Sequence, residues 1–80
     1  MRTIRIRYFA SLREAAGKPE ETLTTDAASL EDLYLQLAGS YGFGLSPLQV
    51  RAARNREMVG MSESFSSGDE VVFMPPVAGG

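Results

Sequence analysis

Residues 70–80 read EVVFMPPVAGG, and this stretch decides the fold. In an extended chain Val71 and Phe73 face one way, while Val72 and Met74 face the other. Both faces are apolar, which is typical of a strand in the middle of a sheet. The proline that follows lacks the N–H that strand pairing needs, so the sheet should end there and the tail should leave the domain.

The first third of the chain predicts two more strands. Residues 2–9, RTIRIRYF, alternate with the period of a half-buried strand. One face consists of Ile4, Ile6 and Tyr8, and the other of Thr3, Arg5, Arg7 and Phe9. Residues 20–25, EETLTT, contain one large apolar residue, which favours a short edge strand.

A short helix is predicted between these two strands. Ser11 stands three residues before Glu14, which is the spacing of a capping box. The segment LREAAG then ends at Gly17, a residue type that commonly closes helices. We therefore expect one or two helical turns here.

The main helix is predicted from its start signal and its apolar spacing. Ser29 and Asp32 repeat the capping spacing, and the helix should stop near Gly39 or Gly42. Its apolar stripe, at positions i, i+3, i+4 and i+7, consists of Leu30, Leu33, Tyr34 and Leu37.

Two segments contain the residue types of loops and turns. The run YGFGLSP, residues 41–47, indicates a surface loop that Phe43 and Leu45 pin to the core. The run SSGD, residues 66–69, predicts a turn just before the last strand.

The segment LQVRAAR, residues 48–54, is ambiguous between helix and strand. Alanine and arginine favour a helix, whereas the alternation of Leu48, Val50 and Ala52 favours a strand. We favour the strand, with Asn55 and Arg56 turning the chain into a second short strand over residues 57–60.

Together these elements predict one α+β domain over residues 1–80. The core spans residues 1–74, and residues 75–80 form a projecting tail. The domain has two layers, a single sheet and the main helix that covers it. A chain of this length holds one core and little more.

Composition excludes several classes of function. The formal net charge is -2, from seven arginines and one lysine against ten acidic residues, so nucleic acid and anionic membranes are not expected partners. Cysteine and histidine are absent, which argues against disulfides, thiolate or imidazole metal sites and Cys/His or Ser/His nucleophilic pairs. The chain contains no apolar run of signal-peptide or membrane-span length, so we expect a cytoplasmic protein.

The tail combines restricted and unrestricted backbone. Pro75 and Pro76 fix φ and make the exit from the sheet a stiff spacer. Gly79 and Gly80 have no Cβ, so this flexible end could enter a channel too narrow for other residues. A terminal carboxylate at Gly80 is a poor acyl donor until it is activated, for example as an acyl-adenylate made from ATP.

Residues 68–80, GDEVVFMPPVAGG, resemble the C-terminal signature of the small subunit of molybdopterin synthase. Residues 4–17, IRIRYFASLREAAG, resemble the first strand and helical turn of the same family. The resemblance implies a ubiquitin-like β-grasp fold, with a mixed sheet of four to five strands on one main helix.

The resemblance also implies a function. Gly80 would be adenylated with ATP by an E1-like partner enzyme and converted to a thiocarboxylate with sulfur from a sulfur-donating protein. The large synthase subunit, in a heterotetramer, would then receive the tail, and the sulfur would pass to cyclic pyranopterin monophosphate to build the dithiolene of the molybdenum cofactor. The residues that guide the tail would be Pro75, Pro76, Val77, Ala78 and Gly79. The chain itself would bind no metal or cofactor and have no turnover alone.

The sequence also contains candidates for a partner surface. Phe9, Phe73 and Met74 are candidates for an apolar sheet face that meets a partner, as in the family, although core packing is equally compatible with Phe73. The segment RAARNRE, residues 51–57, is more charged than the family pattern. Its arginines Arg51, Arg54 and Arg56 could contact phosphate or an acidic partner, but a solvated surface is the simpler interpretation.

Three alternatives to the molybdopterin pathway stay open. Related carriers ending in Gly-Gly supply sulfur for thiamine, cysteine or tRNA thiolation. A ubiquitin-like modifier would instead join Gly80 to lysine through an isopeptide bond. A non-covalent binding module would carry the tail incidentally.

Overall fold

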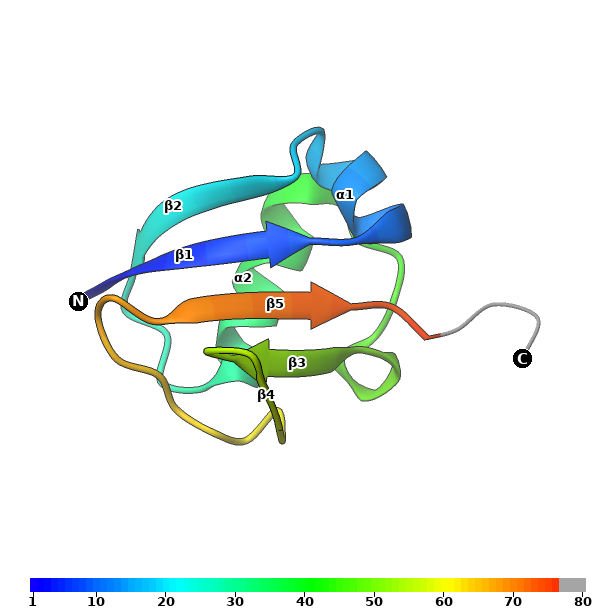
Figure 1. Ribbon diagram of the computed structural model, residues 1–80. Helices are drawn as coiled ribbons and strands as arrows, with labels where there is room; N and C mark the ends of the chain where they lie inside the picture. The colour runs from blue at the N-terminus through cyan, green and yellow to red at the C-terminus, as the bar shows by residue number, and fades with distance from the viewer. Residues whose placement is uncertain (77–80) are drawn as a thin grey trace.

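The computed structural model describes residues 1–76, which form a five-stranded sheet and two helices (Figure 1). The elements in chain order are β1 (Arg2–Tyr8), α1 (Ala10–Ala16), β2 (Glu20–Thr25), α2 (Leu30–Tyr41), a 3₁₀ turn (Pro47–Gln49), β3 (Arg51–Arg54), β4 (Glu57–Val59) and β5 (Glu70–Met74). The α+β class predicted from the sequence is confirmed. No helix within residues 1–76 has the length and apolar character to cross a membrane.

The last strand lies in the middle of the sheet, as its two apolar faces predict. The strand order is β2-β1-β5-β3-β4. β5 runs parallel to β1, with Tyr8 opposite Phe73, and antiparallel to β3, with Arg51 opposite Met74. The sheet is therefore mixed, and the Thr-rich strand β2 lies at its edge as predicted.

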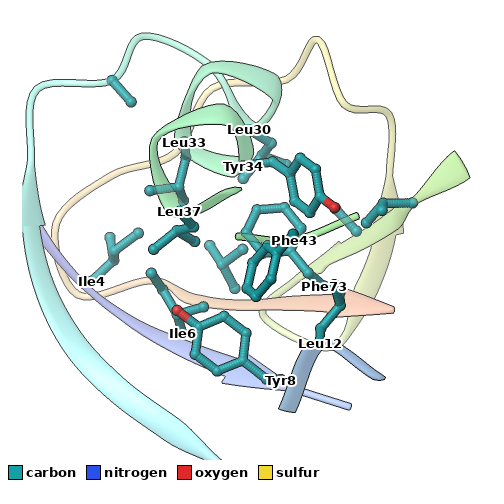
Figure 2. Packing of buried hydrophobic residues seen from close by; sticks show 14 of the residues in the cluster. Ile4, Ile6, Tyr8, Leu12, Leu30, Leu33, Tyr34, Leu37, Phe43 and Phe73 are labelled. Carbon is teal, nitrogen blue, oxygen red and sulfur yellow. The ribbon is translucent and has the colours of Figure 1, made fainter. Parts of the chain in front are cut away.

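The core fills the space between the sheet and α2 (Figure 2). Leu30, Leu33, Tyr34 and Leu37, the predicted stripe of the main helix, are all buried. The ring of Tyr34 stacks on Phe43 at 5.6 Å between centroids and meets the edge of Phe73 at 5.5 Å. The Tyr34 hydroxyl donates to the Leu45 carbonyl at 2.8 Å, so both predicted loop contacts are present.

The ends of α2 agree with the sequence prediction. The Ser29 hydroxyl accepts a hydrogen bond from the backbone N–H of Asp32 at 3.2 Å, which satisfies one donor of the first turn. Gly42 closes the helix with φ of 73°, a left-handed conformation that glycine adopts without a Cβ clash.

The start of α1 differs from the prediction. Ser11 lies inside the helix, and Phe9 occupies the N-cap position with no side-chain cap. The helix follows directly on β1, with Ala10 at φ of 50°, so the chain has already turned before Ser11. The closure at Gly17 is confirmed, with φ of 76°.

The strand predicted over residues 48–54 is shorter in the structure. Leu48 lies in the 3₁₀ turn and is 94% exposed, because Pro47 starts that turn and the chain becomes extended only at Val50. Asn55 and Arg56 form the predicted turn, both with positive φ, which is typical of a two-residue hairpin loop.

Candidate functional site

The tail leaves the sheet from its central strand. β5 runs away from the end of the molecule that carries the N-terminus (Figure 1). Strand pairing stops at Met74, as the sequence predicts, and is followed by a half-buried Pro75 and an exposed Pro76. The predicted tail residues Val77, Ala78, Gly79 and Gly80 lie outside the described residues, so their roles stay predictions.

A groove of about 520 Å³ lies where the tail begins. Its lining consists of Leu48, Gln49, Val50, Arg51, Met58, Met74, Pro75 and Pro76. The register explains this grouping, because β3 places Arg51 opposite Met74 at the end of β5. Leu48 is 94% exposed and Met58 is 57% exposed, so the groove offers apolar side chains to solvent.

The groove continues into the face of the sheet opposite α2. Because side chains alternate along a strand, the residues between the buried ones belong to this face. We call it the open face, and it comprises Arg5, Arg7, Arg51, Ala53, Met58, Val72 and Met74. Val72 and Ala53 are each 8% exposed although no element of residues 1–76 covers this face, because longer neighbours flank them.

Three predicted surface residues have different positions. Met74 lies on the open face and lines the groove, half-buried. Phe9 is 44% exposed beyond the end of β1, and the guanidinium carbon of Arg7 is 6.0 Å from its ring centroid. Phe73 is 0% exposed, so its assignment to a partner surface is wrong: its side chain points toward α2 and packs in the core.

Phe9 is also not a strand residue, contrary to its assignment to one face of the first strand. β1 ends at Tyr8, and Phe9 is the N-cap of α1. The Tyr8–Phe73 pair is the last one between β1 and β5, so Phe9 and Met74 are the residues that follow it on the two chains. Both therefore lie near the end of the sheet from which the tail departs.

The arginines of residues 51–57 do not form one basic site. Arg54 donates to the Ser64 carbonyl at 2.6 Å and lies 3.6 Å from the Glu63 carboxylate. Arg56 lies in the hairpin turn. Arg51 makes no side-chain hydrogen bond or ion pair within residues 1–76 and, unlike Arg54 and Arg56, borders the groove, where it could meet an acidic partner group.

Sequence reasoning missed Leu48 and Met58 as groove residues. Leu48 was assigned to a strand pattern, and Met58 belongs to a strand of three residues whose partner face could not be inferred. The signal that could have found Leu48 is Pro47, which interrupts a strand and favours a turn. Residues 1–76 contain no group of three or more side chains placed to hold a metal ion.

The ThiS family model matches residues 6–80 of this sequence. The chain belongs to the ThiS family. The molybdopterin synthase sulfur carrier subunit of Chlamydomonas reinhardtii is 37% identical to it, over 96% of this chain and 98% of that protein. The subunit of the same name from Escherichia coli is 31% identical, over 96% of this chain and 99% of that protein.

A solved structure supports the fold of this ThiS family member. The crystal structure of SAMP1, small archaeal modifier protein 1, from Haloferax volcanii has a TM-score of 0.77 and 28% identity, covering 98% of this chain and 99% of that chain. The ubiquitin-like β-grasp fold and the resemblance to the molybdopterin synthase small subunit are thus both confirmed.

Proposed function

We propose that this chain is the sulfur carrier subunit of a molybdopterin synthase and carries sulfur as a thiocarboxylate on Gly80. The observation that carries the proposal is similarity to two sulfur carrier subunits over 98–99% of their own length. The tail PPVAGG adds to it, because it follows the central strand of a β-grasp domain directly.

The chemistry requires an activated carboxyl group. The Gly80 carboxylate attacks the α-phosphate of ATP on an E1-like partner enzyme, pyrophosphate leaves and an acyl-adenylate remains. A persulfide of a sulfur-donating protein then attacks the acyl carbon and AMP leaves. A thiol cleaves the S–S bond of the resulting acyl disulfide, so that the thiocarboxylate stays on Gly80 and the donor sulfur forms a disulfide with that thiol. Donation of that sulfur to cyclic pyranopterin monophosphate returns Gly80 to a carboxylate, and two such donations supply the dithiolene.

In this reaction sequence the domain provides the surface on which a partner docks, and its last strand sets where the tail starts. A segment of six residues, the length of 75–80, spans up to about 20 Å when fully extended, which is enough to reach a site inside a partner while the domain stays outside. The prolines reduce the entropy that the tail loses on docking. The groove and the open face surround the start of the tail, so a partner that receives the tail would cover Met58 and Met74. The large synthase subunit and the E1-like enzyme are the proposed partners.

The test is the intact mass of the chain purified from a host that contains its activating enzyme. We expect a species in which one oxygen is replaced by one sulfur. Deletion of Gly80 should leave the unfolding midpoint unchanged and abolish this species, whereas Leu35→Glu, on the exposed side of α2, should retain it. A chain that acquires no sulfur from its native activating enzyme, or a Gly80 deletion that still transfers sulfur, would contradict the proposal.

The similarity to SAMP1 favours a second candidate, a protein modifier. In that case Gly80 would form an isopeptide bond with a lysine of another protein. The same mass experiment separates the two, because a modifier yields higher-mass conjugates that persist under reducing and denaturing conditions, while a carrier yields the free thiocarboxylate.

A further inference from the structure

The chain contains one lysine, Lys18, beside seven arginines. A guanidinium group keeps its proton in proteins and so is a poor nucleophile toward acyl groups. Lys18 is therefore the only side-chain amine in the whole sequence that an activated acyl group could modify. This matters for a protein whose own carboxyl group is activated.

Lys18 does not extend freely into solvent. It lies in the turn between α1 and β2, and its side chain is 42% exposed. Its Nζ is 3.7 Å from Glu21 Oε1 and 5.4 Å from the centroid of the Tyr41 ring. The ammonium group thus lies next to a carboxylate and an aromatic ring, both of which favour its charged form.

The carboxylate that holds Lys18 is itself fixed. Glu21 Oε2 accepts hydrogen bonds from the Tyr8 hydroxyl at 2.5 Å and from the Tyr41 hydroxyl at 2.6 Å. The two tyrosine rings meet edge to face at 6.0 Å, and the Glu21 side chain is 15% exposed. Because Oε2 is occupied by two donors, Oε1 is left for the ammonium group.

This arrangement opposes acylation of Lys18. An amine attacks an acyl carbon through its nitrogen lone pair, which the ammonium form lacks. The interaction with Tyr41 and the negative charge of Glu21 raise the pKa of Lys18 above its usual value. The reactive free amine is therefore rarer than at an ordinary surface lysine.

We propose that Glu21 and Tyr41 keep Lys18 from acting as an acyl acceptor, so that the activated chain does not become joined to copies of itself through this side chain. The inference rests on the proposed function, because it assumes that Gly80 is activated. In the side reaction, Nζ of Lys18 attacks the acyl carbon of Gly80 in a second copy, the bond from that carbon to the AMP oxygen breaks, and the amine proton passes to solvent. AMP leaves, and the amide that forms removes the carboxyl group from further sulfur transfer.

The first experiment measures the reactivity of Lys18 without any partner. The full-length chain is treated with the N-hydroxysuccinimide ester of acetic acid, and acetylation of each amine is followed by peptide mass spectrometry. The Arg13→Lys variant supplies an internal reference, because Arg13 is exposed on α1 and makes no ion pair within residues 1–76. We expect acetylation at Lys18 to be at least about threefold slower than at the introduced amine, because the Glu21 carboxylate and the Tyr41 ring favour the unreactive ammonium form.

Repeating the acetylation in two further variants shows whether Glu21 and Tyr41 cause the slow reaction of Lys18. Glu21→Gln removes the charge but retains an oxygen that can accept from both tyrosines, and Tyr41→Leu removes the ring and its hydroxyl. Either change, added to Arg13→Lys, should bring the two acetylation rates to within about twofold. Equal rates at the two amines in the Arg13→Lys chain would overturn the proposal, and so would a Lys18 rate that neither change increases.

The second experiment uses the full chain with a C-terminal thioester prepared by intein cleavage. The linkage site in each dimer is mapped by peptide mass spectrometry, because the exposed α-amine of Met1 can also accept the acyl group. The wild-type thioester should give few dimers linked through Lys18, Glu21→Gln should give more of them, and Lys18→Arg in that background should remove them. Equal yields of Lys18-linked dimers from wild type and Glu21→Gln would overturn the proposal. Neither experiment requires a thiocarboxylate, so its absence from cells would count against the proposed function without changing these results.

Discussion

The side chain of Asn55 joins the β3–β4 turn to the start of β5. Its Nδ2 donates to Asp69 Oδ1 at 3.0 Å, and its Oδ1 accepts from the backbone N–H of Glu70 at 2.9 Å. The backbone N–H of Asn55 donates to the Glu70 carbonyl at 2.8 Å. One residue in the left-handed region, with φ of 53°, thus holds the hairpin against the central strand.

Replacing Asn55 should therefore destabilise the domain in two ways, through the loss of its side-chain hydrogen bonds and through the cost of a Cβ at positive φ. Asn55→Ala loses both side-chain hydrogen bonds and keeps a Cβ at positive φ, which should cost about 2 kcal/mol. Asn55→Gly loses the same bonds without the conformational cost, so it should be the more stable variant. Urea unfolding of the three proteins checks this order, and equal stability of the two variants would show that the backbone conformation contributes nothing.

Asp69 should make stability depend on acid pH. The backbone N–H of Ser66 and the amide of Asn55 lower the pKa of Asp69 below its ordinary value of 3.8. The unfolded chain therefore binds this proton at higher pH than the folded chain does, so the stabilisation is complete above pH 3.8 and is lost as the pH falls through the lower folded value.

The matched variant for this effect is Asp69→Asn, which has no proton to bind. Its free energy of unfolding should lie below that of the wild type at pH 6, and the difference should shrink as the pH falls below 3.8. Urea titrations at a series of pH values measure both curves. A difference that stays constant down to pH 2 would show that the carboxylate charge is not what matters.

Much of the fold could be predicted because local signals and packing agree. The two apolar faces of residues 70–74 indicate a central strand. Ser29 marks the start of α2 in the sequence, and Gly39 or Gly42 marks its end, of which the structure uses Gly42. The position of Ser11 shows where local spacing fails, because a capping pattern does not reveal that the chain has already turned at Ala10. Capping residues are informative only where the preceding chain is extended.

The groove could not be predicted for a different reason. It depends on the register that places Arg51 opposite Met74 and on the 3₁₀ turn that exposes Leu48, and both are set by contacts far apart in sequence. Likewise, alternation alone separates Phe73 from Met74 but does not say which of the two faces α2 covers. The strand pattern therefore separates the two faces of β5 but does not predict which of them packs against α2.

Alanine variants of Phe73 and Phe9 test directly which of the two rings is buried in the core. Phe73→Ala should destabilise the domain by about 3–5 kcal/mol, because it removes a fully buried ring that contacts Tyr34. Phe9→Ala should change stability by about 1 kcal/mol or less, since the ring is 44% exposed. Thermal and urea unfolding measure both, and similar losses from the two variants would contradict the positions of these rings.

The final prediction concerns the surface around the tail. Met58→Glu places a carboxylate on the open face beside the groove, at a side chain that is 57% exposed, so the free energy of unfolding should change by about 0.5 kcal/mol or less. Leu35→Glu is the matched control, because Leu35 is 50% exposed on α2, on the other side of the sheet.

If partners dock over the groove, Met58→Glu should weaken binding by about tenfold or more, as expected when a charge enters an apolar contact, while Leu35→Glu should leave it unchanged. Calorimetric titration with the large synthase subunit and with the activating enzyme measures both effects, and equal affinities for the two variants would place the docking surface elsewhere on the domain.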